Sequence, residues 1–183
     1  MTVALSGGVT FFQYRDKNGV RRHMYETARE LSVLAHRGGA LFIVNDHADI
    51  ALVVDADGVH LGQDDLPIDA ARKLLGRQKI IGISTHSREQ AVAAEASGAD
   101  YIGFGPIFPT STKDAGKTQG LDALASIKKT VAIPVIAIGG INHDNVRDVI
   151  KAGADGAAVI SAILSAPDMK LAAERMIKNI RNA

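Results

Sequence analysis

The sequence predicts an α/β protein in which short parallel strands alternate with helices. Seven short apolar runs, rich in Val, Ile and Phe, recur along the 183 residues, and helical spacing separates most of them. The runs are apolar throughout, which is typical of strands covered on both faces in a parallel sheet. Such strands belong either to a closed (β/α) barrel or to an open doubly wound sheet. The runs cover residues 9–14, 41–45, 58–61, 80–84, 101–108, 135–139 and 156–163.

Helix signals lie between these runs. Four apolar residues after the first run share one helical face: Met24, Ala28, Leu31 and Ala35. Ser87 followed by Gln90 predicts a capping box at the start of a helix, and Asn142 is placed to cap the helix that carries Val146, Val149 and Ile150. Ser165 and Pro167 are predicted to open a last helix, whose apolar stripe is Met176, Ile177 and Ile180.

Several strands are introduced in the same way. Gly-Ala-Asp at 98–100 precedes one run, Gly-Ala-Asp at 153–155 precedes another, and residues 55–58 are a looser version. Glycine at this point ends a helix and turns the chain into the next strand. This repetition supports regular strand and helix alternation.

The position of the polar residues favours the barrel. Small, polar and charged residues cluster just after the strands, where a (β/α) barrel places its active site. Gly139-Gly140 and Ile160-Ser161-Ala162 follow the last two runs and suit the phosphate site that such barrels build there, although a tight turn also explains the glycines. No Gly-x-Gly-x-x-Gly follows an early strand, so a dinucleotide-binding sheet is disfavoured. We therefore expect one (β/α) TIM-barrel domain over residues 1–183, with seven visible strands.

Composition limits the function classes. The chain has 21 Lys and Arg against 20 Asp and Glu, which gives no general electrostatic reason to expect binding to nucleic acid or a membrane. Cysteine is absent, which excludes disulfides and thiolate catalysis and is compatible with a cytoplasmic protein. The apolar runs are too short and interrupted to predict a membrane span. Self-association into a homo-oligomer stays open.

The stretch 103–113 suggests a phosphate site. Two prolines and three adjacent hydroxyl residues lead into a lysine, in what is predicted to be a loop after a buried strand. Hydroxyls and backbone N–H groups donate hydrogen bonds to phosphate, and a lysine adds charge. The residues concerned are Thr110, Ser111, Thr112 and Lys113. An ordinary solvated loop is the alternative interpretation of this stretch alone.

Further polar side chains follow the first four strands. The first run leads into Gln13, Tyr14, Arg15, Asp16 and Lys17, the second into Asn45 and Asp46, the third into Asp65, and the fourth into Ser84. Because parallel strands end on one rim, these groups are predicted to converge on a charged substrate. Arg15 and Lys17 alternate on an extended strand end and can grip one phosphate group.

Asp46 and Asp65 offer oxygen ligands from adjacent strands. This suits Mg²⁺, which commonly takes one or two carboxylates and completes its shell with water and substrate phosphates. A strand-end Asp can also serve as a helix cap or turn residue. Asp64 is the less suitable ligand, because neighbouring residues on an extended segment point apart. No histidine has zinc-type spacing, and none is assigned a catalytic role.

Together these motifs resemble the thiamine phosphate synthase family over nearly the whole chain and in the same order. The matching stretches are Gly7–Thr10 with Gln13–Lys17, Ile43–Asp46, Asp57–Asp65, Gly82–His86, residues 103–113, Ala137–Ile141 and Gly153–Gly156.

The resemblance implies a (β/α) barrel that joins 4-amino-5-hydroxymethyl-2-methylpyrimidine diphosphate to thiazole phosphate and releases pyrophosphate. Its mechanism is dissociative: the diphosphate leaves first, and the thiazole nitrogen captures the pyrimidine methyl cation. The resemblance assigns Gln13, Arg15, Lys17, Asn45, Ser84 and Lys113 to the pyrimidine diphosphate, with Tyr14 and Asp16 beside them, and Asp46 and Asp65 to Mg²⁺. It assigns Thr110, Ser111, Thr112, Gly140, Ile160 and Ser161 to the thiazole phosphate. Arg15, Lys17, Ser84 and Lys113 are the expected catalytic residues.

The family barrel has eight strands, whereas this sequence shows seven. Residues Thr2–Leu5 resemble the end of the first barrel helix, so the first strand is expected to be missing. An open sheet edge would expose backbone groups and invite pairing. Two other functions are retained as alternatives, a thiazole tautomerase and a noncatalytic phosphate-ligand binding protein. The cationic and acidic rim residues argue against the tautomerase, which has no diphosphate to ionise.

Overall fold

The protein, described here from a computed structural model that covers residues 1–110 and 117–183, is built on one parallel sheet. Its seven strands pair in chain order. They are β1 (Phe11–Tyr14), β2 (Leu41–Asn45), β3 (Gly58–Leu61), β4 (Ile80–Thr85), β5 (Tyr101–Phe104), β6 (Val135–Ile138) and β7 (Gly156–Ala158).

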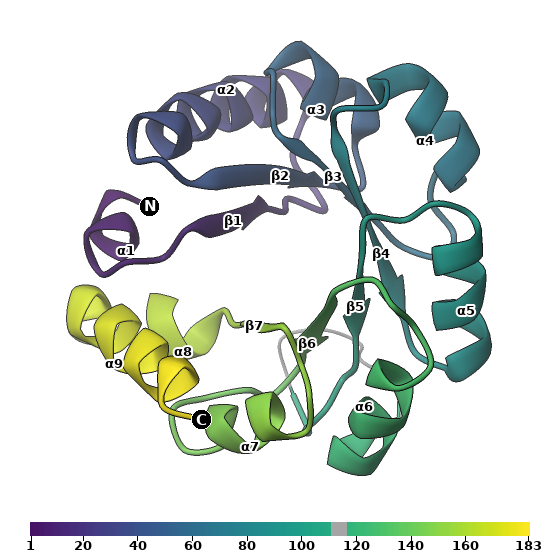
Figure 1. Cartoon of the computed structure of the whole chain (residues 1–183). Coiled ribbons are helices and arrows are strands. Elements are labelled where there is room, and N and C mark those ends of the chain that lie inside the picture. The colour runs from purple at the N-terminus through teal and green to yellow at the C-terminus, as the bar shows by residue number, and fades with distance from the viewer. Residues whose placement is uncertain (111–116) are drawn as a thin grey trace.

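Helices cover the outer face of this sheet (Figure 1). They are α1 (Thr2–Ser6), α2 (Arg21–Arg37), α3 (Ala48–Val53), α4 (Ile68–Leu75), α5 (Arg88–Ala96), α6 (Gly120–Lys128), α7 (Val146–Lys151), α8 (Ser161–Leu164) and α9 (Met169–Arg181). The sheet curls into a barrel that stays open between β1 and β7, and α1 and α9 lie beside this opening. Among the described residues, ladders join each strand to the next and none joins β7 to β1. The predicted seven-stranded barrel-like α/β fold is confirmed.

The main core lies between the sheet and the helices. Strands β3 and β5 are buried along their whole length, as their continuous apolar sequences predict. Side chains such as Phe42, Val59, Ile81 and Phe104 are at most 1% exposed and face α2 to α5. Burying each such side chain stabilises the fold by roughly 1.5–3 kcal/mol, which holds the strands in register.

Two strand predictions need correction at their carboxyl ends. The run 101–108 stays extended only to Phe104, because the chain then turns at a cis peptide bond between Gly105 and Pro106. The run 156–163 is a three-residue strand, β7, followed by the short helix α8. Residues 161–164 are apolar enough for either state, and packing of α8 on α9 decides for the helix.

The helix signals were mostly right. Ser87 Oγ accepts from the N–H of Gln90 at 3.2 Å, which confirms Ser87 as the cap of α5. Gln90 Oε1 reaches back as in a capping box, but it accepts from the N–H of His86, one residue before the cap, at 2.7 Å. Asn142 accepts N–H bonds in the turn before α7, but Asn145 is the residue that directly precedes the helix. The last helix begins later than predicted, since Asp168 rather than Ser165 or Pro167 caps α9.

Candidate active site

The carboxyl ends of β1 to β4 bring the predicted rim residues to one edge of the barrel. Strand register places Asn45 beside His60, and the N–H of Asp46 donates to the His60 carbonyl at 2.9 Å. The segment after β3 then carries Asp65 back towards Asp46. Residues separated by about twenty positions therefore meet because their strands are neighbours.

Asp46 and Asp65 form an acidic pair on this rim. Asp46 adopts φ 65°, a left-handed conformation that is rare for a residue with a side chain and is often found at functional sites. Burial raises the pKa of the Asp46 carboxyl, and the adjacent Asp65 raises it further, whereas Arg15 opposes the shift. Asp65 also accepts from the Gly62 N–H at 2.6 Å, which fixes its loop. A cation between these carboxylates would relieve their repulsion.

Two cationic residues, Arg15 and Lys17, follow β1. Arg15 is close enough to influence the charge of Asp46, and among the described residues its buried Nε has no hydrogen-bond partner. A buried unpaired donor of this kind is costly unless a ligand satisfies it. Lys17 is exposed beyond it. Arg15 is therefore near enough to the acidic pair to meet an anion bound there, and a phosphate contact by Lys17 stays a prediction.

Tyr14 and Asp16 lie differently from the other residues of this stretch. Tyr14 points to the helix side of the sheet, where it interacts with Thr27 of α2. Burial, and then the neighbouring Asp16, raise the pKa of Tyr14. Asp16 accepts from the N–H groups of Asn18 and Gly19 at 3.1 and 2.8 Å, so its carboxylate holds the turn after β1. Substrate contact by these two residues stays a prediction.

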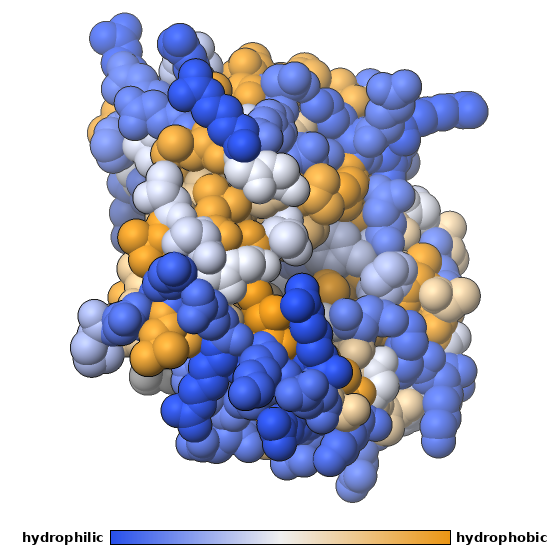
Figure 2. Space-filling model, turned by 60° about the vertical axis from the view of Figure 1, so that its left-hand side comes forward, coloured by the Kyte–Doolittle hydropathy of each residue, from blue (hydrophilic) through white to orange (hydrophobic). Residues whose placement is uncertain are grey.

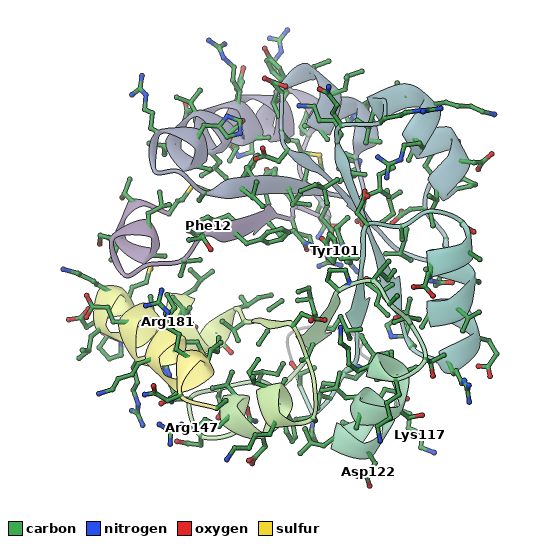
Figure 3. The ribbon with its side chains drawn as sticks, viewed as in Figure 1. Phe12, Tyr101, Lys117, Asp122, Arg147 and Arg181 are labelled. Atoms are coloured by element: carbon green, nitrogen blue, oxygen red, sulfur yellow. The ribbon has the colours of Figure 1, made fainter. Side chains whose placement is uncertain are left out.

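Three more of the predicted pyrimidine contacts, Gln13, Asn45 and Ser84, lie on the inner face of the barrel. Asn45 and Ser84 are both 6% exposed, although they are polar. Ser84 Oγ lies 2.8 Å from His60 Nε2, and the Ser84 carbonyl accepts from Gln63 Nε2 at 2.6 Å. Gln13 reaches inwards from β1 and hydrogen-bonds to Tyr101. Figure 3 shows Tyr101 pointing into the barrel interior towards β1.

The loops after β5 and β6 pack against each other. Gly140 has φ 68°, and a Cβ added there would lie 2.6 Å from the Pro109 carbonyl oxygen. Gly139 has φ 88° and lies equally close to Pro106. Both glycines are therefore required by close approach as well as by their turn. The contact sets Gly140 directly beside the segment that leads to Thr110.

The rest of the predicted thiazole phosphate site is only partly described. Ser111 and Thr112 lie outside the described residues, as does Lys113, which was predicted to bind the pyrimidine diphosphate. Ile160 and Ser161 are exposed at the start of α8, immediately after β7. They therefore follow the carboxyl end of β7, which is where the sequence predicted them to lie. Phosphate contact by these two residues stays a prediction.

Sequence reasoning gave no role to His60, and it did not consider Tyr101 as part of the site. His60 lies in the middle of β3 with its ring inside the barrel, 6% exposed and bonded through both ring nitrogens. The available signal was a polar residue in a strand that is otherwise apolar, Gly-Val-His-Leu. A buried polar side chain of this kind must have partners.

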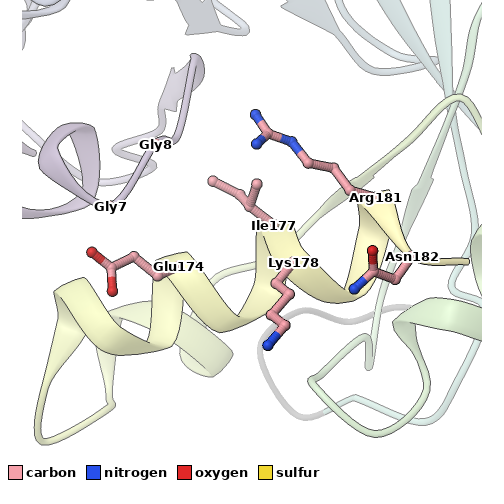
Figure 4. Close-up of a pocket in the computed structure, with 7 residues that line it drawn as sticks. All are labelled: Gly7, Gly8, Glu174, Ile177, Lys178, Arg181 and Asn182. Carbon is pink, nitrogen blue, oxygen red and sulfur yellow. The ribbon is translucent and has the colours of Figure 1, made fainter.

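A separate groove of about 280 Å³ lies at the barrel opening, between the end of α1 and α9 (Figure 4). It is lined by Gly7, Gly8, Glu174, Ile177, Lys178, Arg181 and Asn182. Gly7 and Gly8 precede β1, so the groove flanks the amino end of that strand. The rim residues follow the carboxyl ends, and the groove is not part of the candidate site.

The described residues contain no cluster of three or more His, Cys, Asp or Glu side chains arranged to hold a metal. Asp46 and Asp65 supply two carboxylates, which fits an ion that takes its other ligands from water and phosphate. Among the same residues, no helix is both long and apolar enough to cross a membrane.

A family model described as thiamine monophosphate synthase matches residues 1–163. The chain belongs to the thiamine monophosphate synthase family. Its relatives include thiamine-phosphate synthases from Methanospirillum hungatei, 54% identical over 94% of this chain and 84% of the relative, and Chloroflexus aurantiacus, 52% identical over 94% and 80%. The solved thiamine phosphate pyrophosphorylase from Pyrococcus furiosus superposes with a TM-score of 0.93 at 48% identity, covering 99% of this chain and 87% of that one.

Membership of the thiamine monophosphate synthase family makes the chain a transferase of thiamine biosynthesis that releases pyrophosphate. The resemblance and the fold predicted from the sequence are confirmed. The tautomerase and the noncatalytic binding protein are not supported by these relatives.

Proposed function

We propose that this chain joins 4-amino-5-hydroxymethyl-2-methylpyrimidine diphosphate to thiazole phosphate in a Mg²⁺-dependent, dissociative reaction. Its expected location is the cytoplasm, and its expected partners are these small molecules. The observation that carries the proposal is the acidic pair Asp46 and Asp65 facing Arg15, whose buried Nε lacks a partner. An acidic pair beside a cation is suited to a ligand that is itself anionic and metal-bound, such as a diphosphate.

Asp46 and Asp65 would hold Mg²⁺, which supplies Lewis-acid stabilisation of the charge that develops on the diphosphate. Arg15 and Lys17 then bind the oxygens of the same group and stabilise them most where charge increases. Ser84 donates from the barrel interior towards the pyrimidine diphosphate. No side chain need act as a nucleophile, because the bond to the diphosphate breaks before the new C–N bond forms.

The loops after β5, β6 and β7 are assigned the thiazole phosphate. Gly140 lies against the segment leading to Thr110, and Ile160 and Ser161 follow the last strand. Phosphate binding at these last loops is a common property of (β/α) barrels. Binding both substrates on one rim supplies proximity for capture of the cation.

A pyrophosphate-release assay tests the proposal. The purified chain is incubated with both substrates and Mg²⁺, and each component is omitted in turn. We expect release only in the complete mixture, loss on chelation with EDTA, and recovery on adding excess Mg²⁺. Isomerisation of a thiazole phosphate without pyrophosphate release, or binding without turnover, would overturn the assignment.

A further inference from the structure

A chain of polar side chains crosses the barrel interior behind the rim. It starts at the exposed Gln13 on β1, passes through the buried Tyr101 on β5 and His60 on β3, and ends at the buried Ser84 on β4. The Tyr101 hydroxyl lies 2.8 Å from His60 Nδ1, and His60 Nε2 lies 2.8 Å from Ser84 Oγ. Tyr101, His60 and Ser84 are 7%, 6% and 6% exposed.

The hydrogen-bond direction along this chain follows from the chemistry of its members. A neutral imidazole donates through one ring nitrogen and accepts through the other, so His60 accepts from one of its two hydroxyl neighbours and donates to the other. Burial raises the pKa of Tyr101, so its hydroxyl keeps its proton at neutral pH. Because a phenol is a stronger hydrogen-bond donor than a serine hydroxyl, we assign Tyr101 as the donor to His60 Nδ1. His60 then carries its proton on Nε2 and donates to Ser84.

Two glycines make room for the rings of this chain. A Cβ at Gly82 would lie 2.1 Å from the Tyr101 ring, and a Cβ at Gly103 would lie 3.1 Å from the His60 ring. The two rings are 5.4 Å apart between centroids and inclined at 35°. Because Gly82 of β4 and Gly103 of β5 have no side chain, the Tyr101 and His60 rings fit across the barrel interior.

We propose that His60 is a positioning residue that orients the Ser84 hydroxyl towards the pyrimidine diphosphate. Ser84 Oγ accepts from His60, so its own proton is directed to a different acceptor, which we assign to an oxygen of the bound substrate. The Tyr101 hydroxyl stabilises this tautomer by donating to His60 Nδ1. The inference rests on the proposed function for the identity of the acceptor, but not for the His60 tautomer.

The competing explanation is that His60 has a purely structural role. Two substitutions separate this explanation from the positioning role. The amide nitrogen of glutamine can take the place of Nε2 and donate to Ser84, whereas asparagine reaches only the position of Nδ1. We expect His60→Asn to lower kcat by about 10- to 100-fold, as loss of a residue that orients an active-site group does, and His60→Gln to retain most activity. The KM for thiazole phosphate should change in neither variant.

The control for these assays is the exposed His23 of α2, since His23→Asn should leave kcat unchanged. Thermal unfolding shows whether each variant is folded. Equal losses in folded His60→Asn and His60→Gln would overturn the positioning role.

A double-mutant cycle asks whether His60 acts through Ser84. If it does, His60→Asn in a Ser84→Ala background should be no slower than Ser84→Ala alone. Independent, multiplicative losses would contradict the proposal.

The tautomer is measured without any turnover. Nitrogen-15 NMR of the imidazole should show Nε2 protonated and Nδ1 unprotonated in the unmodified chain at neutral pH, and the pattern should change in Tyr101→Phe. An Nδ1–H tautomer would overturn the inference. A chain that shows the expected tautomer but releases no pyrophosphate would instead contradict the proposed function, so the two failures are distinguishable.

Discussion

Asp46 combines three unusual features in one residue. Its backbone is left-handed, its carboxyl is partly buried, and a second carboxyl, that of Asp65, lies directly beside it. Each feature costs free energy, and a strained residue with a like-charged neighbour is retained most readily where a ligand uses both. Asp64 has none of these properties, since its side chain is exposed on the adjacent turn.

This contrast gives a matched pair of substitutions. We expect Asp46→Ala to lower turnover at ordinary Mg²⁺ concentrations by about 100-fold or more, because loss of a metal ligand weakens stabilisation of the departing diphosphate by several kcal/mol. Asp64→Ala should retain near-normal turnover. Steady-state assays over a range of Mg²⁺ concentrations measure both, and excess Mg²⁺ should restore part of the activity of Asp46→Ala. Near-normal activity of Asp46→Ala at low Mg²⁺ would contradict the metal assignment.

The aspartates that introduce alternate strands share one structural role. Asp57 before β3, Asp100 before β5 and Asp155 before β7 each accept the N–H at or near the start of the preceding strand, at 2.7, 2.7 and 2.8 Å. Each also contacts a basic side chain, namely His36, Arg72 or Lys128. The Gly-Ala-Asp repeat and its looser version at 55–58 therefore connect neighbouring strands at their amino ends, opposite the candidate active site.

Asp100 offers the clearest test of this tie. Asp100→Ala leaves the N–H of the fully buried Ile81 without the carboxylate acceptor, so we expect the free energy of unfolding to fall by about 1–3 kcal/mol. Asp100→Asn keeps an acceptor oxygen and should lose less. Urea denaturation measures both variants. Asp144→Ala is the control, because that side chain is 89% exposed, and its effect should stay within about 0.5 kcal/mol. Equal stability of Asp100→Ala and Asp144→Ala would contradict the role.

Elements were predicted best where the sequence pattern is long or repeated. Strands β2 and β3 have the predicted bounds, and α2 carries its four predicted residues on one face. One error falls in a short apolar stretch, where periodicity does not separate strand from helix. Residues 161–164 are apolar enough for either state, and they form the helix α8, which packs on α9. The other errors lie at the ends of elements, where local turn and cap geometry sets the boundary.

The whole molecule is shaped by the opening between β1 and β7. Figure 2 turns this side towards the viewer and shows apolar side chains around a central hollow, with hydrophilic side chains over much of the lower part. Phe11 of β1 and Leu41 of β2 are 39% and 41% exposed, although they belong to the sheet. Helices α1 and α9 pack together beside the opening and connect the two ends of the chain.

The end of α1 approaches α9 closely at Gly7. The Gly7 φ of −83° is ordinary, but an added Cβ would lie 2.7 Å from Ala173 Cβ and 2.9 Å from the Lys170 carbonyl oxygen of α9. We expect Gly7→Ala to push α1 away from α9 and to lower the free energy of unfolding by about 1–3 kcal/mol, which thermal or urea denaturation measures.

The neighbouring Ser6 supplies the control, because its side chain is exposed and donates to the Val3 carbonyl of its own helix. Ser6→Ala should change stability by at most about 0.5 kcal/mol. An unaltered midpoint for Gly7→Ala would show that α1 is not held against α9 in solution.

The sequence by itself determined the alternation of strands and helices, the order of the rim residues and the family. These properties depend on local periodicity and on motifs, both of which are written along the chain. Only the tertiary structure decided that Asp46 faces Asp65, that Tyr14 turns towards α2, and that His60 links Tyr101 to Ser84. Those relations depend on strand register and on the curl of the sheet, which set distances between residues far apart in sequence.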